Sequence, residues 1–256
     1  MNKYMTEIQA RKAICDIGDK MYIKGFVAAN DGNISVKISD DTIIVTPTGV
    51  SKGGMTPASL VKMKLDGTVL GDNKPSSEVK MHIRVYRLNQ TVNSVVHAHP
   101  PGSTAFAIAR IPMDRPIMSE SIVTLGVVPV ADYALPGTEE VPNSIEPFIN
   151  SHNAVLLANH GLLTWGESLT QAWYRMETAE QYSNIMTRLK SIGEPKEFSS
   201  SQINDLINIR KNMGIESGGV PSCKSHSESD LNADSKAEHQ EELIEKIIRQ
   251  VLSQLK

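Results

Sequence analysis

The chain has few cysteines, little net charge and no long apolar run, and each absence narrows its class. Its 256 residues include only Cys15 and Cys223, which lie far apart in dissimilar contexts, so a framework of disulfides is not expected. A formal net charge of -3 gives no reason to expect nucleic acid or an anionic membrane as a partner. No segment approaches the roughly 20 apolar residues that span a bilayer.

The start of the chain also lacks a targeting pattern. Residues 1–22 carry charges throughout and contain no unbroken apolar block of the kind found in a signal peptide. We therefore expect a cytoplasmic protein. With 40% hydrophobic residues, a chain of this length can bury one good core and a small appendage.

The composition changes sharply near residue 214, which divides the chain into three parts. Residues 1–213 alternate helical and strand-like patterns and are expected to form one domain. Residues 214–238 are rich in Gly, Ser and charge, so they are expected to form a flexible linker. In residues 239–256 apolar side chains recur every three or four positions, which predicts a short amphipathic helix that must bury its stripe against a partner.

The body is predicted to have an α/β fold of αβα layers, with a largely antiparallel central sheet covered by helices. Ser76 or Ser77 is a favoured N-cap and is expected to start the second helix, while Ser168 and Gln171 fit a capping box. Strand patterns are found at 34–38, 42–46, 60–65, 93–99, 127–130, 154–158 and 161–165. Helices are expected at about 6–25, from 76 or 77, near 103–110, around 142–150 and at about 169–190.

Two histidines near the end of an apolar run are the most informative feature of the sequence. His97 and His99 are followed by Pro100 and Pro101, which end the strand. Side chains at positions i and i+2 of a strand share a face, so the two imidazoles would lie side by side, as a divalent metal requires. Two satisfied surface histidines are the alternative.

A third histidine follows another buried strand. His160 lies between Asn159 and Gly161, and Gly161 permits a tight turn or a close backbone approach. Taken alone, a histidine in this position is more often structural than a ligand. Three histidines at strand ends match the open three-ligand site of a catalytic metal centre.

Several loops that could bind an anion lie close together in the sequence upstream of these histidines. The segment 31–35 contains Asp-Gly-Asn, and the segment 46–54 is dense in glycine and hydroxyl groups. Such loops can turn several N–H groups toward a phosphate, and Ser76 and Ser77 at a helix N-terminus add more donors. Each loop alone is usually just a turn, but together they suggest a phosphorylated substrate. Glu78 follows directly and could move a proton, or could simply complement the helix dipole.

Five motifs in this order and spacing resemble the class II aldolase/adducin family: GNIS, TPTGVSKGG, KPSSE, VVHAHPP and ANHG. The resemblance covers roughly residues 5–210. Members include aldolases of L-fuculose 1-phosphate and L-rhamnulose 1-phosphate and the 4-epimerase of L-ribulose 5-phosphate. The resemblance implies a class II aldolase-like fold for the body.

The resemblance also implies roles for particular residues. His97, His99 and His160 match the ligands of one zinc ion per subunit, and Glu78 matches a proton shuttle that in some members also touches the metal. Positions that hold the substrate phosphate are matched by Asn33, Thr48, Gly49, Ser76 and Ser77, with Gly32 shaping the first loop. Such enzymes are typically homotetramers with active sites between subunits. His82 and His152 match no ligand position and are expected to be structural or exposed.

The activity implied is a reversible, zinc-dependent aldol cleavage. A ketose 1-phosphate, L-fuculose 1-phosphate or a similar sugar, would give dihydroxyacetone phosphate and an aldehyde such as lactaldehyde. Alternatives within the family are a pentulose-phosphate 4-epimerase such as that for L-ribulose 5-phosphate, a methylthioribulose-phosphate dehydratase or a sugar-acid phosphate decarboxylase. A non-catalytic, adducin-like binding domain is a further alternative, against which the presence of all the ligand residues argues.

One departure from the family pattern concerns a tyrosine that the neighbouring subunit usually supplies. The matching segment, residues 117–121, reads Ile-Met-Ser-Glu-Ser. Either Glu120 takes over proton transfer or another tyrosine, such as Tyr133, compensates.

The C-terminal segment 239–256 resembles the encapsulation peptides that direct enzymes into bacterial microcompartments. That resemblance implies a shell protein as partner and a location inside a microcompartment. The alternative is a helix that packs on its own tetramer or forms a coiled coil.

Overall fold

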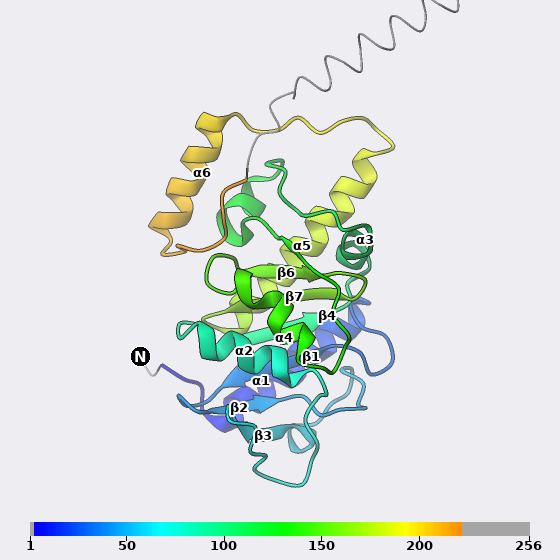
Figure 1. The fold of residues 1–256 in the computed structure, drawn as a ribbon, viewed down its shortest axis with the longest axis vertical. Coiled ribbons are helices and arrows are strands. Elements are labelled where there is room, and N and C mark those ends of the chain that lie inside the picture. The colour runs from blue at the N-terminus through cyan, green and yellow to red at the C-terminus, as the bar shows by residue number, and fades with distance from the viewer. Residues whose placement is uncertain (1–2, 222–256) are drawn as a thin grey trace, which may run out of the picture. The chain divides into compact units, whose positions relative to one another are not determined.

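The structure is a computed structural model that describes residues 3–221. Its centre is a seven-stranded sheet in the order β3-β2-β1-β4-β7-β6-β5, and most of this order can be followed from bottom to top in Figure 1. Every neighbouring pair is antiparallel except β5 and β6. The strands are β1 (Asn33–Lys37), β2 (Thr42–Val45), β3 (Val61–Lys64), β4 (Ser94–Ala98), β5 (Val130–Ala131), β6 (Ala154–Leu157) and β7 (Gly161–Gly166).

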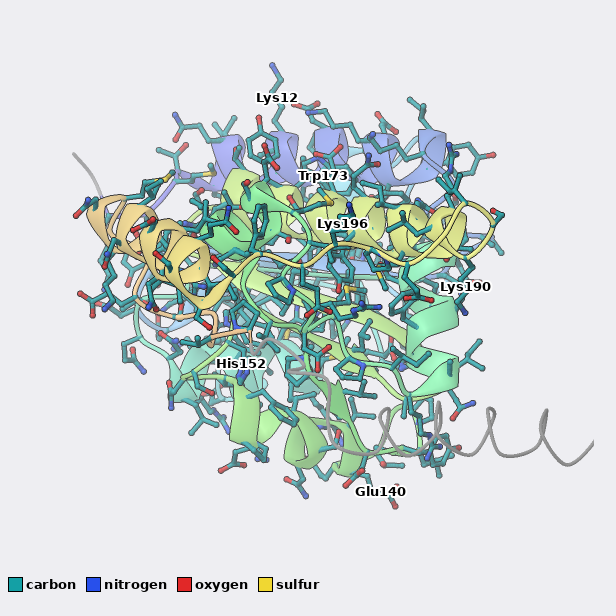
Figure 2. The ribbon with its side chains drawn as sticks, turned by 90° about the horizontal axis from the view of Figure 1, so that it is seen from above. Lys12, Glu140, His152, Trp173, Lys190 and Lys196 are labelled. Carbon is teal, nitrogen blue, oxygen red and sulfur yellow. The ribbon has the colours of Figure 1, made fainter. Side chains whose placement is uncertain are left out.

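Helices cover both faces of this sheet, as the sequence predicts. Buried side chains of α1, α3 and α5 share one core with the sheet, and those of α2 and α4 share a second core on the opposite face. Figure 2 shows α1 and α5, marked by Lys12 and Trp173, on one side and α4, marked by Glu140, on the other. The helices are α1 (Glu7–Ile23), α2 (Val79–Leu88), α3 (Pro101–Ala109), α4 (Glu140–Ile145), α5 (Leu169–Leu189) and α6 (Ser200–Asn212).

Three short helical turns complete the described elements. Two are 3₁₀ turns at Pro57–Ser59 and Glu146–Phe148, and the third is a π-helical turn at Ser121–Leu125. None of the helices within residues 3–221 combines the length and apolar character that crossing a bilayer requires.

The centre of the sheet is buried on both faces. All residues of β1, β4, β6 and β7 are buried, which explains why the sequences of β4, β6 and β7 are mostly apolar, although β1 alternates polar and apolar residues. Trp165 on β7 and Trp173 on α5 are each 1% exposed and fill the two cores on opposite sides of the sheet. Burying a large apolar side chain contributes roughly 2–3 kcal/mol.

The start of α2 differs from the prediction. The helix begins at Val79 with Glu78 as its N-cap, so neither Ser76 nor Ser77 caps it. The hydroxyl of Ser76 instead accepts a hydrogen bond from the backbone N–H of Glu78, at 3.3 Å. Hydroxyl side chains favour such local turns as readily as caps, and this turn places Glu78 at the tip of the helix.

The capping box predicted for α5 forms only in part. The hydroxyl of Ser168 accepts from the N–H of Gln171, but the amide oxygen of Gln171 accepts from Glu167 instead of the cap residue. A complete capping box, Ser199 with Gln202, starts α6, a helix that the sequence analysis missed.

The chain after α6 stays attached to the body beyond the predicted boundary at 213. Gly218 donates to the carbonyl of Ser151 and accepts from the N–H of Val127, and the guanidinium of Arg210 donates to Gly219. These bonds hold the last described residues, which belong to the segment predicted as linker. The rest of that linker and the predicted helix at 239–256 lie outside the described residues.

Candidate metal centre and anion pocket

His97 is the most deeply placed of the three predicted ligands. It lies on β4 in the middle of the sheet, opposite Asn33 of β1 and Leu163 of β7, and its side chain is fully buried. Its Nδ1 is 3.0 Å from the carbonyl oxygen of Leu162. Because a carbonyl only accepts, Nδ1 carries the proton and Nε2 presents a lone pair.

His99 follows the end of β4. Its backbone N–H donates to the carbonyl of Phe26, and Pro100 and Pro101 then end the extended segment and begin α3. Its Nδ1 is 3.4 Å from Oδ2 of Asp31, and its Nε2 is 3.2 Å from Nε2 of His97. A carboxylate beside Nδ1 favours the tautomer in which Nε2 is free to bind a cation.

His160 reaches the same point from the turn between β6 and β7. Asn159 adopts the left-handed conformation with φ of 57°, which asparagine tolerates well. Gly161 has no room for a side chain, since a Cβ there would lie 2.5 Å from the carbonyl oxygen of Ala98 and 2.6 Å from the ring of His99. The imidazole of His160 lies with its ring centre 4.8 Å from that of His97 and 5.0 Å from that of His99.

The three imidazoles fit a divalent cation. One nitrogen from each of His97, His99 and His160 lies within 4.8 Å of the others. A tetrahedral ion with bonds of about 2.0–2.1 Å needs nitrogens roughly 3.3 Å apart, close to the separation found between His97 and His99. The hydrogen bonds at Nδ1 of His97 and His99 orient both rings toward the shared point.

Burial keeps the imidazoles available as ligands. It lowers the pKa of His97 well below the ordinary value and also lowers the pKa of His99, because an imidazolium is poorly solvated inside the protein. Neighbouring histidines add to both shifts, while Glu78 opposes both and Asp31 opposes that of His99. Neutral imidazole is the form that binds metals.

Glu78 lies between the histidines and the anion loops. Its Oε1 is 3.1 Å from Nε2 of His160 and its Oε2 is 3.5 Å from Nε2 of His97. The side-chain amide of Asn33 donates to Oε2 at 2.9 Å. Burial acts to raise the pKa of Glu78, but His97, His160 and the Asn33 hydrogen bond outweigh it and hold this pKa below its usual value.

The loops predicted to bind an anion surround one cavity of about 220 Å³ beside the histidines. Gly32 and Gly49 both have positive φ, at 74° and 72°, so each turns its loop in a way that favours glycine. A Cβ at Gly32 would also lie 2.9 Å from the carbonyl oxygen of His97. The cavity is lined by Asn30, Asp31, Gly32, Asn33, Pro47, Thr48, Gly49, Ser76, Ser77, Glu78, His99 and His160.

All the predicted site residues therefore meet in one place, with His97 just behind the lining. Two neighbours of these residues are not predicted from the sequence. Asp31 precedes the GNIS motif, and its side chain contacts His99. Lys52 lies inside the TPTGVSKGG motif and is 1% exposed. Their motifs marked their positions, but only the fold shows what their side chains contact.

The two histidines expected to be structural or exposed lie outside the cluster. His82 is fully buried and bonded through Nδ1 to the hydroxyl of Ser35, at 2.7 Å. Nδ1 of His152 is 2.8 Å from the hydroxyl of Ser151, and its ring packs edge-on against Phe148. Cys15 is buried and free, and Cys223 lies outside the described residues.

Comparison with known proteins identifies the family. Residues 12–187 match the family described as the class II aldolase and adducin N-terminal domain, which is more than half of the chain. The chain belongs to this family.

Named relatives of this class II aldolase family protein include enzymes that act on sugar phosphates. It is 32% identical to a 3-oxo-tetronate 4-phosphate decarboxylase from Escherichia coli over 70% of this chain and 87% of that protein. It is 33% identical to a 5-deoxy-D-ribulose 1-phosphate aldolase from Bacillus thuringiensis, covering 77% and 92% of the two chains. The crystal structure of an L-fuculose-1-phosphate aldolase from Thermus thermophilus superposes with a TM-score of 0.66 and 29% identity, covering 74% and 99%.

Proposed function

We propose that this class II aldolase family protein is a zinc-dependent lyase that cleaves a ketose 1-phosphate to dihydroxyacetone phosphate and a small aldehyde. The observation that supports this most directly is the meeting of three imidazoles and one carboxylate beside a cavity lined by anion-binding loops. A donor set of three nitrogens favours zinc over magnesium or calcium, which prefer oxygen ligands.

A zinc ion held by His97, His99 and His160 would supply a Lewis acid that stabilises the negative charge developing on the substrate's oxygens. The histidines themselves keep the site rigid, since two of them are anchored through Nδ1. Because His99 and His160 line the cavity, an ion held by the three histidines would have an open position there for substrate oxygens.

The proposed role of Glu78 is proton transfer at C3. In cleavage, the C4 hydroxyl gives its proton to a base, the role proposed below for a side chain of the neighbouring subunit, while the C3–C4 bond breaks and its electron pair stays with the three-carbon fragment as an enediolate. Glu78 takes up a proton from solvent and delivers it to C3, which completes dihydroxyacetone phosphate. In the synthetic direction the ionised Glu78 removes that proton, which suits a carboxyl whose pKa lies below its usual value.

The proposed phosphate site uses backbone and hydroxyl donors from three segments. Gly32 and Asn33 end the first loop, Thr48 and Gly49 belong to the second, and Ser76 and Ser77 precede α2. N–H groups at a helix start attract a phosphate through both hydrogen bonds and the helix dipole.

A second activity is favoured by the relative from Escherichia coli, whose name describes a decarboxylase. A 3-oxo acid with a 4-phosphate can lose its carboxyl group as CO₂, and the electron pair of the broken bond then forms the same enediolate. Protonation gives dihydroxyacetone phosphate again. Aldehyde release and CO₂ release therefore require the same stabilisation and the same proton donor, and they differ in the group that leaves.

A substrate panel separates the two activities. The zinc-loaded protein is incubated with L-fuculose 1-phosphate, 5-deoxy-D-ribulose 1-phosphate and 3-oxo-tetronate 4-phosphate, and dihydroxyacetone phosphate is measured by a coupled assay. Aldehyde is measured with the ketose phosphates and CO₂ with the acid. We expect dihydroxyacetone phosphate with a ketose 1-phosphate, and its release from the acid alone would make the protein a decarboxylase.

Variants test the metal centre in the same assay. His97→Ala is expected to lose zinc and activity, whereas His152→Ala, which changes a histidine outside the cluster, keeps both. If no member of the panel reacts with zinc bound, the lyase proposal is wrong. If His97→Ala retains full zinc content, the metal site is wrong.

We further propose that the protein is a homotetramer whose neighbouring subunit completes the active site. Glu120 is exposed and Tyr133 is 57% exposed, and neither lines the cavity of its own chain. Either side chain is thus free to serve a neighbouring subunit. Sedimentation equilibrium gives the assembly, and Tyr133→Phe and Glu120→Gln show which side chain matters for cleavage at unchanged assembly.

Residues 239–256 are proposed to direct the enzyme into a bacterial microcompartment by binding a shell protein. The support is the apolar stripe in their sequence, which includes Ile244, Ile248 and Val251. Residues 236–256 fused to a fluorescent protein should co-localise with shell proteins in cells that make them. An Ile248→Asp fusion is the matched control, and diffuse signal from the unmodified fusion would contradict the proposal.

A further inference from the structure

Lys52 is a buried cation next to the anion cavity and has no part in the function proposed above. It lies within the second anion loop, in the segment Val50-Ser51-Lys52, and its side chain is 1% exposed. Lysine rarely lies so deep without a specific set of partners, because its flexible chain normally carries the ammonium to water.

The partners of Lys52 are the two loops that form the cavity. Its Nζ donates to the carbonyl oxygen of Asn30 at 2.8 Å and to that of Val50 at 2.7 Å. Asn30 begins the loop that carries Gly32 and Asn33, and Val50 follows Thr48 and Gly49. One ammonium group therefore ties together the two loops that converge on the cavity.

Helix α1 holds the backbone at Lys52 in the position that this contact needs. The backbone passes so close to Gly18 that a Cβ there would lie 2.6 Å from the carbonyl oxygen of Lys52. Gly53 packs against the ring of Tyr22, and Gly54 donates its N–H to Asp19 at 2.7 Å. With its backbone fixed on the helix side, the side chain of Lys52 runs inward between the loops.

The positive charge of Lys52 lies near a cavity whose wall carries negatively charged side chains. The lining includes the carboxyl groups of Asp31 and Glu78, and among the described residues it contains no Lys or Arg. A phosphate dianion entering there would meet negative side chains with no compensating cationic side chain in the wall. Burial lowers the pKa of Lys52 to about 8, while Asp31 and Glu78 act to raise it, so the side chain is an ammonium at neutral pH.

We propose that Lys52 is the cation of the anion pocket: it fixes the two loops by its hydrogen bonds and offsets the negative charge of a bound phosphate without touching it. The inference rests on the proposed phosphate site and not on which bond the enzyme breaks. Lys52 is in this sense a positioning residue, and its charge is the property that a purely structural residue would not need.

Binding of sulfate tests the proposal, since sulfate is a dianion of phosphate's shape whose charge does not change between pH 6 and pH 10. Titration calorimetry compares the zinc-loaded protein with Lys52→Met, which removes the charge and nearly keeps the volume. We expect about tenfold weaker binding or worse in this variant. The matched control is Lys64→Met, at a partly exposed lysine 3.8 Å from Asp41, which should bind as the unmodified protein does.

Two further variants separate the possible outcomes. Lys52→Arg keeps the charge and is expected to bind sulfate within about threefold of the unmodified protein. Thr48→Val changes the cavity wall and should weaken binding, which places the sulfate in this cavity. Unchanged affinity in Lys52→Met, at normal zinc content, would refute the role of Lys52 while leaving the phosphate site intact. No sulfate binding by the unmodified protein would overturn the phosphate site and this inference with it.

If Lys52→Met does not fold, the unmodified protein provides the test through pH. Affinity for sulfate should fall between pH 7 and pH 10 as Lys52 loses its proton, and equal affinity at both values would refute the proposal. Asp31, Glu78, His99 and His160 are the other titratable groups in the cavity wall. The Lys52→Arg variant separates the effect of Lys52 from that of these other groups. Arginine stays charged between pH 7 and pH 10, so the fall in sulfate affinity should disappear in this variant.

Discussion

Acid should destabilise this protein through His82, which lies far inside the core. The side chain is fully buried on α2, and its Nδ1 is 2.7 Å from the hydroxyl of Ser35. The hydroxyl of Tyr86 lies 2.7 Å from the same Ser35 oxygen, so the three polar groups form one enclosed network. Burial lowers the pKa of His82 to about 3, while the charge of Glu78 acts in the opposite direction.

The sign and size of this loss of stability follow from the protonation of His82 in the folded and unfolded states. An unfolded histidine has a pKa of about 6.5, so between pH 6.5 and pH 3 the unfolded chain binds a proton that the folded chain does not. The stabilisation is complete above pH 6.5 and is lost as the pH falls, by roughly 1.4 kcal/mol for each unit. From pH 6.5 to pH 4.5 the loss amounts to about 2 kcal/mol, a large share of the 5–15 kcal/mol typical of a domain.

Urea unfolding at pH 6.5 and pH 4.5, at one protein concentration, measures this loss. The reference is His82→Gln, in which an amide can still bond to Ser35 but does not titrate. Other groups contribute equally to both proteins, so the difference between the two pH dependences isolates His82. Identical pH dependences for the unmodified protein and His82→Gln would refute the argument that burial keeps this imidazole neutral.

Three substitutions at the metal centre are predicted to have distinct effects. Gly161→Ala should weaken zinc binding by roughly 10–100-fold, because its Cβ would displace the ring of His99; normal affinity would mean that the close contact is not needed. Asp31→Asn should weaken zinc by about tenfold through loss of the carboxylate at Nδ1 of His99, measured by competition with a chelator. Glu78→Gln should keep zinc and the fold but lower cleavage by about 10²–10⁴-fold, and a variant with unimpaired turnover would remove Glu78 from the mechanism.

Most of the fold could be predicted from the sequence because its strands are short, clearly bounded and either mostly apolar or alternating. The layered arrangement and the largely antiparallel sheet are confirmed. The start of α2 was placed too early because Ser76 forms a local turn with Glu78 instead of a cap. Helix α6 was missed although Ser199 and Gln202 form a complete capping box, since its apolar stripe is weak and only Ile203 among its apolar residues is buried.

The candidate site was predictable to a different degree. Spacing alone could pair His97 with His99, since neighbours two apart on a strand share a direction. It could not bring His160 to them, because that requires the β4–β7 pairing that sets His97 opposite Leu163. The motif resemblance supplied this link, and the structure brings the residues together. Their roles in binding zinc and phosphate stay predictions, which the measurements above test.

The contacts of Lys52 and Asp31 could not be predicted at all. A lysine in a glycine-rich loop is expected to extend into solvent, and only the close approach of α1 at Gly18 turns it inward. Asp31 likewise contacts His99, which follows the end of β4 and lies more than sixty residues away in the sequence. Both depend on tertiary contacts that leave no periodic pattern.

The geometry of the site rests on how strand β1 matches helix α2. Asn33 and Ser35 are two residues apart on the strand, about 6.6 Å, and their partners Glu78 and His82 are four apart on the chain, about 6 Å along a helix. Because these rises agree, each strand residue meets its own helix residue. A slip of β1 by one residue would turn Asn33 and Ser35 to the opposite face and separate Glu78 from the histidines. The buried bonds of His82 and Tyr86 to Ser35 thus fix the register that brings Glu78, the three clustered histidines and the loops of the proposed anion pocket to one point.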